Sequence, residues 1–208
     1  MKWFLLLTLS CLLFVSADCS GYLQYHYTRR PVNNGECRII PVYVDQSFTT
    51  QQKLSIADGI ASWNYALNNY MRLEAIWSFD MGITDINHIQ DNGGIAILAI
   101  DSSNSIVPIT ADDVLVQAFT TTYRAFPNTH YIYMIVDRLR STKTRFVDAI
   151  RHEIGHGLLA SHIYDHPSIM NDPYVEEYAH CIDQYALHEV AIKNHLDETK
   201  LNYCSYEQ

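Results

Sequence analysis

Two histidines and a glutamate stand at a spacing that suits metal chemistry. His152, Glu153 and His156 belong to the run His-Glu-Ile-Gly-His. In a helix, residues four apart emerge on one face, one turn apart, so both imidazoles can reach a single ion. A carboxylate beside the first histidine can take a proton from a metal-activated water and return it to a leaving amine. The alternative for Glu153 is a solvated helix charge, which the flanking histidines disfavour.

A third histidine follows the pair. His162 lies six residues after His156, beyond one more turn of chain. Three neutral imidazoles with one open position describe a catalytic zinc site, whereas a structural site is closed by four ligands. No cysteine lies nearby in the sequence to close this one. The sequence therefore predicts Zn²⁺ held by His152, His156 and His162, with Glu153 as general base.

The motif needs a helix that buries one face and exposes the other. The apolar period predicts a helix over about 144–159, with Phe146, Ile150 and Ile154 on its core side. This stripe is offset from the histidines by two residues, which is about 200° around a helix axis. We therefore expect the histidines to point away from the core, towards a cleft.

The rest of the chain predicts a sheet that carries this helix. Apolar and β-branched runs predict strands at 38–45, 73–79, 95–100, 114–120 and 131–136. Thr49 and Gln52 form a capping box that opens a helix, whose apolar stripe continues to Met71. A last helix is expected from near residue 180 to residue 196. Within the strand at 38–45, Pro41 predicts that one edge of the strand is free at the proline. This order predicts an α/β domain with a mixed, twisted five-stranded sheet and three helices.

The first residues resemble an export signal. Lys2 precedes an almost wholly apolar run over 3–15, and Ser16 and Ala17 supply small residues before a cleavage point. We expect a signal peptide at 1–17, an N-terminal arm at 18–37 and one catalytic domain at 38–208. The apolar run is short for a bilayer span and no later stretch is long enough. The chain is therefore expected to be secreted, extracellular or, in a bacterium, periplasmic.

The cysteine count predicts disulfides, and the net charge limits the classes of binding partner. Removing the signal leaves four cysteines, an even number that in an exported chain favours two disulfides with three possible connectivities. These are Cys19, Cys37, Cys181 and Cys204. Free, buried thiols are the alternative. The formal net charge of -9 over 208 residues argues against a nucleic-acid-binding face or a polybasic membrane patch. We expect a monomer that binds a protein or peptide substrate in extended form.

The segment 152–162 resembles the long zinc motif of the metzincin metalloproteases, and its residues are most similar to those of the matrixin branch. Metzincins carry a methionine turn beneath the zinc, and Ser168-Ile169-Met170 matches it, eight residues past the third histidine. The resemblance implies an active-site cleft along an edge strand, here 114–119 by position, on which substrate pairs antiparallel. A plain edge strand is the alternative. Pro173 and Tyr174 resemble the lining of the pocket for the residue after the scissile bond.

One position departs from the metzincin pattern. The family has glycine three residues after the second histidine, and Leu159 stands there. If the backbone at this point requires a positive φ, leucine costs on the order of 1–2 kcal/mol. The departure leaves rivals for the third ligand. They are His166, Glu176 and Glu177. A downstream carboxylate as third ligand is typical of the gluzincins.

The residues and the resemblance predict a secreted zinc metalloendopeptidase. Zinc polarises the scissile carbonyl and activates water, and no nucleophilic serine or cysteine is required. The first alternative is a catalytically inactive metal-binding domain, which would not need Glu153. The second is a non-catalytic adhesin with a chance motif, which would not need Met170 at this distance.

Overall fold

The computed structural model describes residues 37–79, 89–90, 92–108, 116–125, 127–139, 143–172, 175 and 180–204. Its helices and strands follow the predicted order. They are β1 (Arg38–Asp45), α1 (Thr50–Ala66), β2 (Met71–Phe79), β3 (Gly94–Ile100), β4 (Ala118–Thr122), β5 (Thr129–Ile135), α3 (Lys143–Gly157), α4 (Gln184–Asn194) and the short 3₁₀ helix Glu198–Lys200. The expected signal peptide and all but the last residue of the expected arm lie outside the described residues. In the part that is described, every helix is too short or too polar to cross a membrane.

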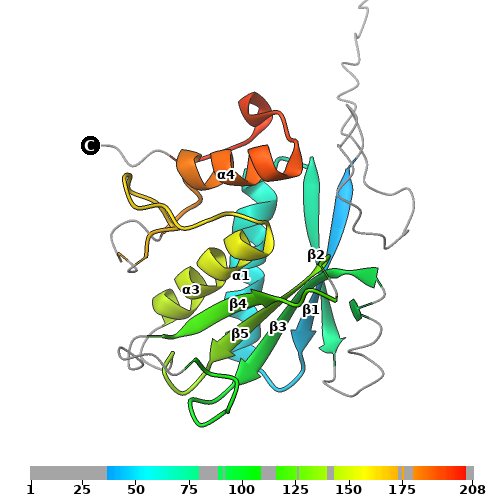
Figure 1. The fold of residues 1–208 in the computed structure, drawn as a ribbon, viewed down its shortest axis with the longest axis vertical. Coiled ribbons are helices and arrows are strands. Elements are labelled where there is room, and N and C mark those ends of the chain that lie inside the picture. Colours follow the sequence, from blue (N-terminus) through cyan, green and yellow to red (C-terminus); the bar gives the residue numbers. More distant parts are fainter. Residues whose placement is uncertain are drawn as a thin grey trace, which may run out of the picture.

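The five strands form one mixed sheet in the order β2-β1-β3-β5-β4. β1 pairs in parallel with β2 and β3, and β3 pairs in parallel with β5. β4 runs antiparallel to β5 and forms one edge of the sheet (Figure 1). The predicted α/β class, the mixed five-stranded sheet and the three helices are thus confirmed.

Local signals explain how α1 begins and what it buries. The Thr49 hydroxyl accepts the Gln52 N–H at 3.3 Å, and the Gln52 side chain accepts the Thr49 N–H at 2.8 Å, which completes the expected capping box. The predicted stripe is buried, and its Trp63 also donates its indole N–H to the Arg151 carbonyl at 2.8 Å. This bond ties α1 to α3. The helix itself ends at Ala66, so Met71 is buried as the first residue of β2.

The helices cover one face of the sheet. Alternate residues of β1 and β3, such as Val42 and Ile97, join α1 and α3 in the larger apolar core. Figure 1 shows α1 and α3 side by side against the sheet, with α4 beyond one end of α1. The opposite strand face carries a second core that includes Tyr43, Leu98 and Tyr133. The histidine motif, which lies on α3, therefore belongs to the helical layer on one face of the sheet.

The helix predicted to residue 159 ends at Gly157, and the strands predicted from 73 and 131 begin at Met71 and Thr129; two other predictions differ more in their bounds. The strand expected at 114–120 is the strand Ala118–Thr122, and Val116 and Gln117 precede it. Residues 114 and 115 lie outside the described part. The apolar run suggested an earlier start, but pairing with β5 begins only at Ala118, opposite Met134. The last helix begins at Gln184, because the Asp183 carboxylate caps it there by accepting two backbone N–H groups.

The free edge predicted at Pro41 needs a qualification. β1 lies inside the sheet, between β2 and β3. Pro41 pairs with Glu74 of β2, and the pairing of β1 with β3 starts one residue later, at Val42. The proline, which has no N–H to donate, therefore stands where the β3 side of the ladder has not yet begun.

The C-terminal segment is tied back to the body of the domain. Cys181 and Cys204 form a disulfide that spans α4. Cys37 is also disulfide-bonded, and its partner lies outside the described residues. Arg38, at the start of β1, donates to the Asn194 side chain at the end of α4 over 3.4 Å. Arg38 thus links β1 to α4, and the Asn194 amide also donates to the Leu158 carbonyl, just past the end of α3, at 2.9 Å.

Candidate metal centre

Three imidazoles converge on one point at the open side of α3. The Nε2 atom of His156 lies 3.1 Å from Nε2 of His152 and 3.0 Å from Nε2 of His162. Among the described residues, these three form the one group of three or more histidine, cysteine or acidic side chains close enough to share an ion. The structure thus brings together all three ligands that the sequence predicts.

Hydrogen bonds fix which ring nitrogen faces that point. His152 Nδ1 lies 2.8 Å from the Ile169 carbonyl, and His156 Nδ1 lies 2.8 Å from the Ala160 carbonyl. A carbonyl only accepts, so each Nδ1 carries the proton and each Nε2 of a neutral ring presents a lone pair. Second-shell carbonyls of this kind orient histidine ligands in metal sites.

The arrangement fits a zinc ion. Lone pairs facing one another at 3.0–3.1 Å repel unless a cation lies among them. Zinc–nitrogen distances of about 2.0–2.1 Å and tetrahedral angles place ligand nitrogens about 3.3 Å apart, close to the observed spacing. Three imidazoles also leave the fourth position open, as a catalytic site requires.

The electrostatics of the rings agree with this role. Burial, together with the neighbouring histidines, lowers the pKa of His152 to about 4, and the hydrogen bond to the Ile169 carbonyl opposes this fall. Burial likewise lowers the pKa of His156. Both rings are therefore neutral at pH 7, which is the form that binds a metal.

A tight turn at the end of α3 brings the third histidine into place. The Leu159 N–H bonds the His156 carbonyl and the Ala160 N–H bonds the Gly155 carbonyl, both at 2.9 Å. This pattern is a Schellman cap, which requires a left-handed residue just past the helix. Leu159 is that residue, with φ of 75°. The backbone thus does require a positive φ at this position, which glycine adopts freely and leucine adopts under strain.

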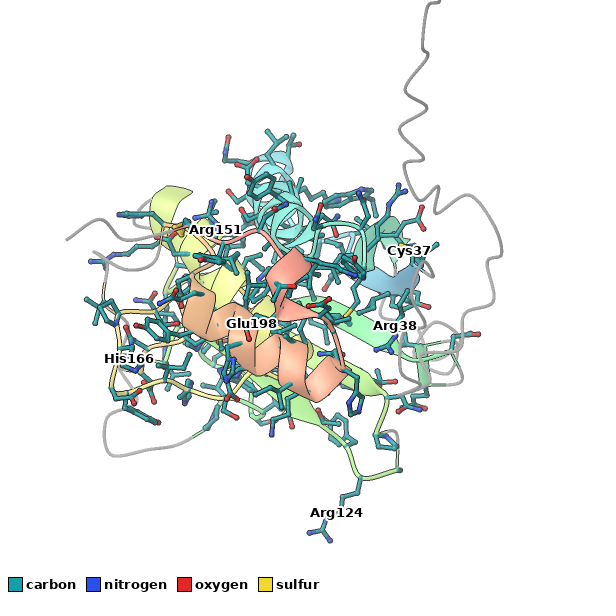
Figure 2. The ribbon with its side chains drawn as sticks, turned by 90° about the horizontal axis from the view of Figure 1, so that it is seen from above. Cys37, Arg38, Arg124, Arg151, His166 and Glu198 are labelled. Atoms are coloured by element: carbon teal, nitrogen blue, oxygen red, sulfur yellow. A yellow bond between two sulfur atoms is a disulfide. The ribbon has the colours of Figure 1, made fainter. Side chains whose placement is uncertain are left out.

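His162 is the most exposed of the three candidate ligands. Its side chain is 34% exposed, and its Nδ1 lies 3.6 Å from the Asp172 carboxylate and 3.4 Å from the Tyr164 hydroxyl. The rival His166 is engaged elsewhere, stacked on Tyr185 with ring centroids 4.1 Å apart. Figure 2 shows His166 at the periphery of the molecule. The other rivals, Glu176 and Glu177, lie outside the described residues.

Met170 lies directly beneath the histidine helix. Its side chain is fully buried, and a Cβ atom built on Gly155 would overlap its sulfur. Its carbonyl accepts the Ile163 N–H at 2.9 Å, so the methionine turn also holds the segment that follows His162. Met170 therefore lies against the helix at Gly155, between the two histidines of α3.

One residue that holds the methionine turn could not be recognised from the sequence. Asp183 is buried, and one of its carboxylate oxygens accepts the Ser168 hydroxyl at 2.9 Å and the Ile169 N–H at 2.8 Å. The other oxygen caps α4. The Ile169 carbonyl in turn orients His152. The only signal in the sequence was an aspartate at the start of a helix, which gives its capping role but not its second contact.

Glu153 is buried on the flank of α3 that faces β4. One carboxylate oxygen, Oε2, accepts a hydrogen bond from the Thr120 hydroxyl at 2.6 Å. Burial raises the pKa of Glu153 to about 7, and the Thr120 bond opposes this rise. A group with such a pKa is suited to exchange protons near neutral pH. Thr120 belongs to the strand that the sequence predicted as the edge, but no local pattern pointed to its contact with Glu153.

The substrate-side predictions fall partly outside the described residues. β4 is an edge strand and reaches Glu153 through Thr120. Pro173 and Tyr174, predicted to line a pocket, lie outside the described part. Comparison with protein-family models and with curated proteins finds no match for this chain. What can be inferred about function therefore rests on the residues of the site.

Proposed function

We propose that this chain is a zinc-dependent endopeptidase of the metzincin type, nearest to the matrixin branch. His152, His156 and His162 hold the ion and Glu153 serves as the general base. The observation that carries this proposal is the convergence of three Nε2 lone pairs, two of them fixed by carbonyl bonds to Nδ1, beside a buried carboxylate on the same helix.

Each group has a defined part in peptide hydrolysis. Bound zinc would polarise the scissile carbonyl and make the attacking water more acidic. Glu153 takes the proton of that water at its carboxylate and later returns it to the leaving amine. Burial favours this exchange, because the apolar surroundings raise the affinity of the carboxylate for a proton. The substrate pairs in extended form with the free edge of β4, which lies beside Glu153.

The proposed enzyme is exported. The apolar run at the N-terminus acts as a cleaved signal, and the mature chain works outside the cell or in a periplasm. The Cys181–Cys204 disulfide supports this, since such bonds persist in oxidising compartments.

The decisive experiment replaces Glu153 by glutamine. The substitution keeps the size of the side chain and removes the base. We expect cleavage of a quenched peptide library to fall by about 10²–10⁴-fold. Zinc content, measured by elemental analysis, should remain at one ion per chain because the histidines are unchanged.

The outcomes separate the alternatives. A zinc-loaded wild-type chain that cleaves no peptide would favour the inactive metal-binding domain. A chain that binds no zinc would favour the adhesin with a chance motif. Equal cleavage by wild type and Glu153→Gln would exclude Glu153 as the base, and joint loss of zinc and fold in the variant would give it a structural role.

A further inference from the structure

We propose that Thr120 is a positioning residue for the Glu153 carboxylate, an inference that rests on the proposed protease function. Its hydroxyl holds one carboxylate oxygen of the base in place and leaves the other oxygen to exchange protons with the attacking water. Nothing in the zinc motif itself includes this residue, which lies 33 positions earlier in the chain.

The contact is short and well placed. The distance from Thr120 Oγ1 to Glu153 Oε2 is 2.6 Å, and the same hydroxyl lies 3.3 Å from the Glu153 backbone carbonyl. Hydrogen bonds to charged acceptors have lengths of this kind and are stronger than neutral ones. Among the described residues, no other hydrogen bond reaches this carboxylate. Without Thr120, its rotation about the terminal bond would be restrained by packing alone, since that torsion has a broad profile.

The backbone around Thr120 makes the restraint firm. Thr120 lies in the middle of β4 and pairs with Ile132 of the buried strand β5. A threonine in a strand has few χ1 rotamers, so its hydroxyl has a defined direction. The base is therefore held by a sheet residue as well as by its own helix, and general-base catalysis depends on such geometry.

The position on β4 adds a link to substrate. β4 is the edge strand of the sheet, so an extended peptide paired to it would be attached to the same element that holds Glu153. Thr120 thus sets the distance between the bound peptide backbone and the base. The alternative is that the bond only fastens β4 to α3, a structural role that would show in stability and not in turnover.

Three variants of the full zinc-loaded chain distinguish these roles. Thr120→Val removes the hydroxyl at constant shape, and Thr120→Ser restores it. Thr129→Val is the matched control, because buried Thr129 on β5 donates its hydroxyl to the Ile89 carbonyl at 3.2 Å, a hydrogen bond that involves neither the histidine triad nor Glu153. For Thr120→Val we expect kcat to fall about 10–100-fold, as for loss of a hydrogen bond to a charged group, with KM within about twofold. Thr120→Ser should recover most of kcat, and Thr129→Val should keep it.

A second readout does not depend on turnover. The side-chain carboxyl ¹³C resonance of Glu153 can be assigned by its absence from Glu153→Gln. Thr120→Val should shift this resonance in both the zinc-free and the zinc-loaded chain, whereas Thr129→Val should leave it in place. An unmoved resonance, or an unchanged kcat in Thr120→Val, overturns the role of Thr120 while leaving the protease proposal standing. A wild-type chain without peptidase activity overturns both.

Discussion

The sulfur of Met170 packs directly against Gly155, the residue just before the second histidine of the motif. A Cβ atom at Gly155 would overlap this sulfur and approach the Met170 methyl group and the Trp63 ring, each at 3.1 Å. Glycine is otherwise unfavourable inside a helix, by about 1 kcal/mol relative to alanine. Its presence here lets the methionine turn lie close beneath the helix that carries the ligands.

Replacing Gly155 by alanine should therefore destabilise the domain despite the better helix propensity. Overpacking a core costs about 1–3 kcal/mol, which exceeds the propensity gain. We expect a net loss of about 1–2 kcal/mol in the free energy of unfolding, measured by urea denaturation. Met170→Ala supplies the matched background, because truncation removes the clash. A Gly155→Ala cost that stays the same in that background would exclude Met170 as its cause.

Leu159 offers a test with the opposite sign. Its φ of 75° costs leucine about 1–2 kcal/mol, and glycine would remove that strain while adding about 0.4–1 kcal/mol of unfolded-state entropy. Leu159→Gly should thus raise the free energy of unfolding by about 0.5–1 kcal/mol. Ala160→Gly, at the next residue, relieves no such strain and should lower it. Destabilisation by Leu159→Gly would mean that the leucine side chain contributes more by packing than its backbone loses.

The raised pKa of Glu153 predicts how the zinc-free chain responds to pH. Its folded-state pKa of about 7 lies above the ordinary 4.5. The group therefore favours folding below pH 4.5, and this contribution is lost as the pH rises to about 7. The glutamine in Glu153→Gln does not titrate, so the variant does not lose this contribution. Its free energy of unfolding should therefore exceed that of wild type by near zero at pH 4.5 and by at most about 3 kcal/mol above pH 7. Denaturation of both chains in chelator at several pH values checks this. A constant difference across that range would contradict it.

The order and type of the elements were readable from the sequence because local interactions specify them. The Thr49–Gln52 capping box and the stripe at Ile56, Ile60 and Trp63 define α1 from residues within one helix. The buried Ile150 and Ile154 and the opposed histidines follow from helical period alone. His152 and His156 share a face for the same reason, so the first two ligands needed no tertiary information.

The features that the sequence did not predict depend on contacts between distant parts of the chain. Thr120 meets Glu153 only because the fold brings β4 against α3, and no local sequence pattern specifies which strand lies there. The second role of Asp183 depends on the methionine turn folding back to α4. The start of β4 depends on which residues face β5, so an apolar run alone placed it too early.

The cysteines give a prediction that combines export with geometry. The mature chain should show no free thiols by intact-mass analysis after alkylation without reductant. Cys181 and Cys204 close a loop with a sequence separation of 23, for which a disulfide contributes about 3 kcal/mol. The double variant Cys181→Ser and Cys204→Ser should lose about 2–4 kcal/mol of unfolding free energy. Recovery of four alkylated cysteines from the exported chain would contradict the pairing.

The identity of the third ligand can be tested by zinc titration. His162→Ala removes one of three imidazoles whose Nε2 atoms converge, so we expect the zinc affinity to fall by more than about 100-fold, beyond the 10–100-fold typical of second-shell changes. His166→Ala is the matched control, because its ring stacks on Tyr185 and does not join the triad. Wild type and His166→Ala should also gain thermal stability on adding zinc, since a ligand that binds only the folded state stabilises it. If His162→Ala keeps full zinc occupancy while Glu176→Ala or Glu177→Ala loses it, a downstream carboxylate is the third ligand and the metzincin proposal fails.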